Sequence, residues 1–207
     1  DPVRGLTNRS SGKQGYAIAD ALARAGAHVT CVARRQGPLD ALGAAMAGEN
    51  LAFAPLALDI TDIEATRAAL AAAQAFDIVV NSAGMARHGP ALDTDPADFD
   101  AVMSVNLRAA YFLSTAAAGR MIETGLRGSI IHVSSQMGHV GGIDRAVYSA
   151  SKHAIEGMIK SMAIEWGPKG IRINSICPTF IRTPLTEKTF ENPERRKWIE
   201  ERSSLAG

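Results

Sequence analysis

The stretch Gly128-Ser-Ile-Ile-His-Val-Ser-Ser135 decides the fold class of this chain. A glycine followed by an apolar, β-rich run is typical of a short strand buried in a parallel sheet. Here the run ends in two hydroxyl residues, Ser134 and Ser135. Open sheets that alternate strands with helices place their binding sites at the carboxyl ends of the strands. The stretch therefore predicts a central strand and a functional position at its end.

Similar apolar runs alternate with alanine-rich helical stretches along the whole chain. The expected strands are 3–7, 28–33, 51–58, 77–81, 129–133 and 172–177, and the expected helices are 16–25, 38–47, 63–73, 96–123 and 147–166. This alternation predicts an α/β fold with a doubly wound parallel sheet, Rossmann-like, with helices on both faces. Expected helix starts and stops are Asp62, Asp95, Gly26, Gly125 and Gly170.

Composition favours one cytoplasmic domain over residues 1–207. The chain is 46% hydrophobic, its net charge is +1, and its basic and acidic residues are interspersed, so we expect neither a nucleic-acid nor a membrane partner. Cys31 and Cys177 lie in apolar runs and are most simply reduced core residues. Neither these cysteines nor His139 and His153 have metal-ligand spacing, so no metal is expected.

Tyr148 and Lys152 are four residues apart in an expected helix, so both side chains project from one face, one turn apart. A phenol is a poor proton donor and acceptor at neutral pH until a nearby cation stabilises the phenolate, and Lys152 supplies that cation. A tyrosine and lysine at this spacing are common on amphipathic helices. The context supports a catalytic pair, because Ser135 stands thirteen residues upstream at a strand end.

Ser135, the Tyr148-Ser-Ala-Ser-Lys152 pattern and their spacing resemble those of the classical short-chain dehydrogenase/reductases. The resemblance implies an NAD(P)-dependent oxidoreductase that interconverts a ketone and a secondary alcohol by hydride transfer. It implies that Tyr148 is the general acid/base, that Ser135 hydrogen-bonds the substrate oxygen, and that Lys152 holds the nicotinamide ribose. Asn106 matches the asparagine that kinks the fourth helix and holds a proton-relay water, and Met137 should line the substrate pocket.

The family's phosphate-binding pattern, Thr-Gly-x-x-x-Gly-x-Gly, is altered here. The corresponding stretch is Thr7-Asn8-Arg9-Ser10-Ser11-Gly12-Lys13-Gln14-Gly15, in which Asn8 replaces the first glycine and one residue is added before Gly15. Ser10, Gly12 and Gly15 are expected to bind the cofactor at a helix N-terminus. Asparagine tolerates positive φ, so Asn8 is compatible with this role. The alternative is that cofactor binding is weakened.

Further cofactor contacts follow from the resemblance. Asp77-Ile-Val-Val-Asn81-Ser-Ala-Gly84 is similar to the family's Asn-Asn-Ala-Gly turn, with Ser82 in place of the second asparagine. The residues expected at the cofactor are Asn81, Ala83 and Gly84 of this turn, Asp59 and Ile60 beside the adenine, and Pro178, Ile181 and Thr183 of the loop that contacts the nicotinamide carboxamide.

The second strand ends in Arg34 and Arg35, with no acidic residue to bind both ribose hydroxyls of NAD. Arginines there can pair with the 2′-phosphate of NADP. We therefore expect NADP rather than NAD. The alternative is that both arginines are surface residues.

The sequence leaves the substrate and the assembly open. The substrate is expected to be a small-molecule ketone or alcohol, such as a sugar acid, a polyol or a 3-oxoacyl group. Family members continue through a further helix and strand that help form oligomers, so C-terminal elements are expected to be missing, with 183–207 part of the substrate lobe. A homo-oligomer, dimer or tetramer, is still expected. The competing hypothesis is a catalytically impaired scaffold that acts as a binding or regulatory protein.

Overall fold

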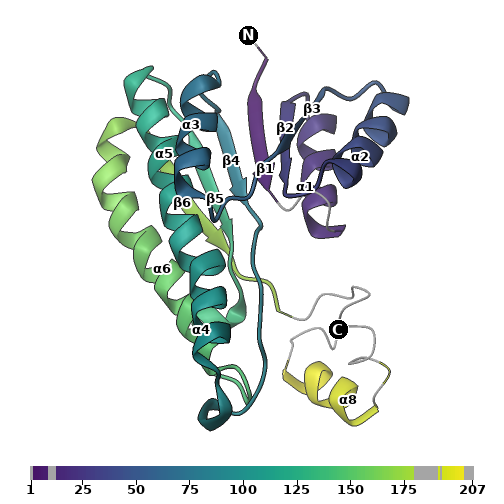
Figure 1. Ribbon diagram of the computed structural model, residues 1–207, viewed down its shortest axis with the longest axis vertical. Helices are drawn as coiled ribbons and strands as arrows, with labels where there is room; N and C mark the ends of the chain where they lie inside the picture. Colours follow the sequence, from purple (N-terminus) through teal and green to yellow (C-terminus); the bar gives the residue numbers. More distant parts are fainter. Residues whose placement is uncertain (1, 9–12, 180–190, 192, 203–207) are drawn as a thin grey trace.

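The computed structural model describes residues 2–8, 13–179, 191 and 193–202. Six parallel strands form one sheet in the order β3-β2-β1-β4-β5-β6 (Figure 1). The strands are β1 (Arg4–Asn8), β2 (His28–Ala33), β3 (Phe53–Ala57), β4 (Ile78–Asn81), β5 (Ser129–Val133) and β6 (Arg172–Ile176). The strand order reverses between β1 and β4, which is where open α/β sheets form a ligand crevice. The predicted doubly wound sheet is confirmed.

Helices cover both faces of the sheet, as predicted. The helices of the described residues are α1 (Lys13–Arg24), α2 (Gln36–Gly48), α3 (Ile63–Ala72), α4 (Pro96–Met103), α5 (Ala110–Glu123), α6 (Ala146–Trp166) and α8 (Pro193–Arg202), with short helical turns η1 (Ala91–Asp93), η2 (Ser104–Ala109), η3 (Gln136–Gly138) and η4 (Gly167–Lys169). Helices α1 and α2 pack on one face, and α3, α5 and α6 pack on the other (Figure 1). Each face thus has its own hydrophobic core.

The helix starts expected at Asp62 and Asp95 and the helix stops expected at three glycines agree with the structure, whereas α1 and α2 begin two to three residues before their expected starts at 16 and 38. Asp62 accepts a hydrogen bond from the backbone N–H of Ala65 at 3.0 Å, and Asp95 accepts one from Ala97 at 2.7 Å. The glycines expected to end helices, Gly26, Gly125 and Gly170, all have positive φ.

The predicted continuous helix over 96–123 is wrong in one respect. It is interrupted by η2, a π-helical turn between α4 and α5. The turn contains buried Asn106, whose side-chain amide bonds outside the helix to the backbone of Met85. π-Helical turns are frequent at functional sites. The kink expected at Asn106 is therefore present as a widened turn.

Strand β1 contains an arginine and a glycine yet pairs with both of its neighbours. Gly5 to Asn8 are all buried, and Arg4, at the strand's start, donates its backbone N–H to the Asp77 carboxylate at 2.8 Å. In the described part of the chain, every helix is too short or too polar to cross a lipid bilayer.

Candidate active site

Two adjoining cavities lie at the carboxyl edge of the sheet, on either side of the point where the strand order reverses. The larger, about 550 Å³, is lined by residues after β2 and β3, including Arg34, Asp59 and Ile60. The smaller, about 270 Å³, is lined by Ser135, Met137, Tyr148 and Lys152, among others. Gly84 and Met85 belong to the walls of both. The fold therefore brings half of the predicted site residues to the walls of these two cavities.

Lys152 lies one turn after Tyr148 on α6, as predicted, and its side chain is almost fully buried. The residue is 4% exposed, and its Nζ donates a hydrogen bond to the carbonyl of Val133, the last residue of β5, at 3.0 Å. Nζ stands 5.7 Å from the centre of the Tyr148 ring. The hydrogen bond to Val133 holds the Lys152 ammonium between the end of β5 and the Tyr148 ring. The positive charge of Lys152 is therefore close to the phenol in the smaller cavity.

Ser135 is the N-cap residue just before η3, and its hydroxyl oxygen accepts a hydrogen bond from the backbone N–H of Met137 at 3.2 Å. Because the oxygen is the acceptor in this bond, the hydroxyl proton can be donated toward the cavity. The next residue, Gln136, donates its backbone N–H to the carbonyl of Pro178 at 3.0 Å. This bond joins the turn after β5 to the loop after β6.

The Asn106 amide uses its oxygen and its nitrogen on protein partners. Its oxygen accepts from the Met85 N–H at 2.8 Å, and its nitrogen donates to the Met85 carbonyl at 2.9 Å and to the Ser151 hydroxyl at 3.0 Å. Ser151 in turn donates to the carbonyl of Tyr148 at 2.7 Å. Asn106 thus links the cavity wall at Met85 to the helix turn that carries Tyr148.

Asn8 does not have a positive φ; it is the last residue of β1 and has a strand conformation. Its side chain forms hydrogen bonds to the residues that follow β4. The amide oxygen of Asn8 accepts from the backbone N–H groups of Ser82 and Ala83 at 2.7 and 2.8 Å. The Ser82 hydroxyl donates to the carbonyl of Asn8 at 2.5 Å. The two departures from the family pattern therefore contact each other, and together they join the ends of β1 and β4.

A chain of buried hydrogen bonds runs from Asn8 across the sheet. The Asn8 amide nitrogen donates to Asn81 Oδ1 at 2.6 Å, and Asn81 Nδ2 lies 3.1 Å from His132 Nδ1. His132 Nε2 lies 2.8 Å from the hydroxyl of Ser114, which donates to the carbonyl of Ala110. Since the Asn81 nitrogen can only donate, Nδ1 must accept, and the proton of a neutral imidazole sits on Nε2.

The neutral form of His132 is also the one that its surroundings favour. Burial, together with the positive charge of Lys152, lowers the pKa of His132 from 6.5 to about 4. Asn81, predicted as a cofactor contact, is buried within this hydrogen-bonded chain.

The remaining predicted cofactor residues are placed as follows. Ala83 and Gly84 line the larger cavity; Asp59 also lines it and accepts hydrogen bonds from the backbone and hydroxyl of Thr61 at 3.0 and 2.8 Å. Gly15 is buried in α1, and Arg35 is exposed at the start of α2 and is not among the residues that line either cavity. Ser10, Gly12, Ile181 and Thr183 lie outside the described residues.

Sequence reasoning missed several cavity residues. His88 and Arg145 line the smaller cavity, and the His88 ring meets the Tyr148 ring edge-on with 6.0 Å between centroids. The pKa of His88 is lowered, mainly by burial and then by the charge of Arg145. No fixed spacing relates these residues to Tyr148, so only the fold could identify them.

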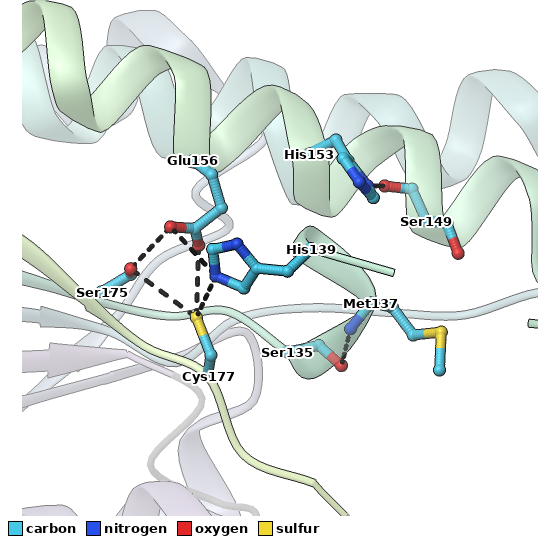
Figure 2. A network of polar contacts seen from close by, with 8 residues as sticks. All are labelled: Ser135, Met137, His139, Ser149, His153, Glu156, Ser175 and Cys177. Carbon is cyan, nitrogen blue, oxygen red and sulfur yellow. Dashed lines mark hydrogen bonds and ion pairs between the residues drawn. The ribbon is translucent and has the colours of Figure 1, made fainter. Parts of the chain in front are cut away.

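A second polar cluster was also missed. His139 and Cys177, for which sequence spacing gave no metal-ligand partners, meet Glu156 of α6 (Figure 2). Burial works to raise the pKa of Glu156, but the neighbouring Ser134 and Ser175 hydroxyls, the Cys177 thiol and the His139 imidazole outweigh it, so this pKa lies below its ordinary value.

A family profile described as short chain dehydrogenase matches residues 10–194. The chain belongs to this family. Short-chain dehydrogenases similar to it include carbonyl reductase [NADPH] 2 of Sus scrofa, 37% identical over 98% of this chain and 82% of the relative. The L-xylulose reductase of Homo sapiens is 35% identical over 92% of this chain and 77% of the relative.

The fold comparison agrees with the sequence comparison. The structure of a gluconate 5-dehydrogenase from Burkholderia cenocepacia J2315, in complex with NADP and tartrate, superposes with a TM-score of 0.89. It is 30% identical and the match covers 95% of this chain and 78% of that one. The resemblance therefore extends over the fold of nearly the whole chain.

Proposed function

We propose that this short-chain dehydrogenase is an NADP-dependent oxidoreductase that interconverts a ketone and a secondary alcohol of a sugar acid or polyol. One observation carries the proposal. Ser135, Tyr148 and Lys152 line one small cavity, and that cavity opens at Gly84 into a larger one. The smaller, polar cavity would hold the reacting carbonyl group, and the larger cavity beside it would hold the dinucleotide.

The residues of the larger cavity fit a dinucleotide. Gly84 lines both cavities, and a Cβ added there would make ordinary contacts, 3.6 Å from both Asn106 Oδ1 and Lys152 Nζ, so this turn lies beside both side chains where the two cavities meet. Arg34 would pair with the 2′-phosphate, and Asp59 with Ile60 would lie beside the adenine. Ala83, Gly84 and Lys152 would hold the two riboses.

Other predicted contacts have supporting or outer positions. The Asn81 side chain accepts a hydrogen bond from the backbone N–H of Ala83 in the turn after β4. Gly15 is a buried residue of α1, the helix that follows the phosphate loop. The carbonyl of Pro178 accepts a hydrogen bond from the backbone N–H of Gln136. Both arginines are exposed, but Arg34 lines the larger cavity and Arg35 does not, so Arg34 is the better candidate for the phosphate contact. The NADPH or NADP in the names of the pig carbonyl reductase and the bacterial gluconate dehydrogenase structure supports the choice of cofactor.

When bound, NADPH would supply the hydride. The protein's residues would supply the proton and hold the substrate oxygen in place. The Ser135 hydroxyl would donate a hydrogen bond to that oxygen and fix the carbonyl. Tyr148 would deliver its phenolic proton to the same oxygen, and Lys152 would stabilise the phenolate left behind. In the oxidation direction the phenolate would take the alcohol proton back. Asn106 would hold the Tyr148 turn and a proton-relay water.

The lining of the smaller cavity supports a hydroxylated substrate. Gln14, His88, Gln136 and Arg145 surround the reactive side chains together with Met137. The lowered pKa of His88 keeps its imidazole neutral at pH 7, so the ring can both donate to and accept from substrate hydroxyls. Arg145 suits a substrate carboxylate. These groups favour a sugar acid or polyol over a 3-oxoacyl group.

Composition supports two further proposals, a single Rossmann-like domain over 1–207 and a cytoplasmic location, and the family resemblance supports a third, a homo-oligomer.

The test is a panel of polyols, sugar acids and their keto forms, followed by NADPH and NADH absorbance, with Tyr148→Phe as the catalytic variant. Loss of the hydroxyl should lower turnover at least about 10²-fold while NADPH affinity, measured by calorimetry, changes little. Tyr111→Phe, on an exposed helix face, is the matched control and should leave turnover unchanged. Turnover by Tyr148→Phe near the wild-type rate would refute the mechanism, and undetectable NADPH binding would favour the scaffold hypothesis.

A further inference from the structure

Three residues from three separate segments bring one potential metal-ligand atom each to a single point (Figure 2). Cys177 follows β6, His139 follows η3, and Glu156 lies in the middle of α6. The Cys177 sulfur lies 3.4 Å from His139 Nε2 and 3.5 Å from Glu156 Oε1. His139 Nε2 lies 3.8 Å from Glu156 Oε2.

These separations match the edges of a zinc coordination tetrahedron. Zinc binds cysteine sulfur at about 2.3 Å and histidine nitrogen or carboxylate oxygen at about 2.0–2.1 Å. At tetrahedral angles these lengths give ligand-to-ligand edges of roughly 3.3–3.6 Å. The sulfur lies within this range of the imidazole and of Glu156 Oε1, while the imidazole approaches the other carboxylate oxygen, Oε2. With one ligand atom from each residue, all separations are within 4.8 Å, so a reorientation of the carboxylate and small shifts of the other two side chains would complete the face.

The same geometry does not fit a catalytic cysteine–histidine–glutamate relay. A relay needs the carboxylate at one imidazole nitrogen and the sulfur at the other, as in the hydrolytic triads. Here the Cys177 sulfur and the Glu156 carboxylate both approach Nε2 of His139. Convergence of three atoms on one point is the arrangement that chelation requires.

The surroundings hold the ligands in position and leave a way in. The Ser175 hydroxyl donates to Glu156 Oε2 at 2.8 Å and so orients the carboxylate, as outer contacts of metal ligands do. Gly138 allows the close approach of η3 and α6, because an added Cβ would stand 2.9 Å from Glu156 Cγ. The His139 side chain is 54% exposed and that of Glu156 is 10% exposed, so the cluster faces solvent on the histidine side.

We propose that His139, Glu156 and Cys177 bind one Zn²⁺, with solvent as the fourth ligand. A thiolate, a carboxylate and a neutral imidazole balance the two charges of the ion, and binding releases the thiol proton. The role is structural, since none of the three side chains is among those that line the cavity of Tyr148. This site is independent of the proposed oxidoreductase activity.

The ion would join three segments that carry candidate active-site residues. His139 follows Ser135 by four residues, Glu156 lies one helical turn after Lys152, and Cys177 precedes Pro178. Zinc at this point would therefore tie the turn after β5, helix α6 and the loop after β6 together. Binding should raise the thermal unfolding midpoint of the protein.

The experiment uses protein stripped with a chelator and titrated with Co²⁺ and Zn²⁺. We expect one equivalent of Co²⁺ to produce a sulfur-to-cobalt charge-transfer band and tetrahedral visible absorption, both displaced by one equivalent of Zn²⁺. Cys177→Ser should abolish the charge-transfer band. His139→Gln, at an exposed position, should fold normally and weaken Zn²⁺ binding more than about 100-fold, and Ser175→Ala about 10–100-fold.

His153→Gln is the matched control, because this exposed histidine lies on the same helix as Glu156 and bonds only to the carbonyl of Ser149 among the contacts drawn in Figure 2. It should bind Zn²⁺ as the wild type does. Circular dichroism and unfolding midpoints without metal establish that each variant folds. Absence of one-to-one binding to the wild type, or binding that His139→Gln and Cys177→Ser both leave unchanged, would overturn the proposal.

Discussion

Acidification should destabilise the fold through His132, the imidazole buried beneath the candidate active site. The folded chain lowers the pKa of His132 from 6.5 to about 4, because burial and then the charge of Lys152 disfavour the protonated ring. The unfolded chain therefore binds a proton at pH values where the folded chain does not. The contribution to stability is fully present above pH 6.5 and is lost as the pH falls toward 4.

The size of the effect follows from the two pKa values. At pH 5 the imidazole is almost fully protonated in the unfolded chain but only about one-tenth protonated in the folded chain. The linkage relation then gives a loss of about 2 kcal/mol in the free energy of unfolding between pH 8 and pH 5. Below pH 4 the loss levels off at roughly 3 kcal/mol.

The assay is urea unfolding, followed by circular dichroism at pH 8 and pH 5, of the wild type and of His132→Gln. All other titrating groups are common to both proteins, so the wild type should lose about 2 kcal/mol more than the variant on acidification. His153→Gln, which removes an exposed histidine, should keep the wild-type dependence. Equal losses in the wild type and His132→Gln would refute the assignment of a depressed pKa to this ring.

Three further predictions concern the cofactor, the reaction and the sheet. Arg34→Asp should move the preference from NADPH toward NADH by about one to two decades in affinity, which calorimetry with both cofactors measures, and an unchanged preference would make Arg34 a surface charge. Lys152→Ala should weaken NADPH binding and slow turnover, whereas Ser135→Ala should slow turnover alone; identical binding losses in the two variants would contradict these roles. Asn8→Ala should lower the free energy of unfolding by about 1–3 kcal/mol, because it removes the acceptor of the buried Ser82 N–H and leaves the Ala83 N–H only its longer bond to Asn81, and a urea midpoint equal to that of the wild type would count against this.

The sequence predicts most of the fold because its signals are local. Strands 28–33 and 129–133 are continuous apolar runs, and both are found with the predicted ends. The break in the helix over 96–123 could not be placed in the same way, since it accompanies a bond between Asn106 and Met85, 21 residues apart. Asn106 could be matched to a family position, but its partner could not.

The candidate site likewise contains some residues that local sequence spacing identifies and others that it does not. Tyr148 and Lys152 are paired by helix periodicity, so sequence spacing identifies them. The partners of Asn8 lie 73–75 residues away, and Cys177 is 38 residues from His139 and 21 from Glu156. Short-range spacing rules carry no information about pairs that meet only when strands β1 and β4, or β6 and α6, are placed side by side.

The contact between Asn8 and Ser82 implies that these two positions are epistatic. Restoring glycine at position 8 removes the acceptor for two backbone N–H groups, and restoring asparagine at position 82 replaces the hydroxyl that donates to the Asn8 carbonyl. Either substitution alone therefore removes hydrogen bonds at the junction of β1 and β4, so its effect on stability should depend on the residue at the other position. Attempts to repair the phosphate loop by grafting glycines should treat positions 8 and 82 as one unit.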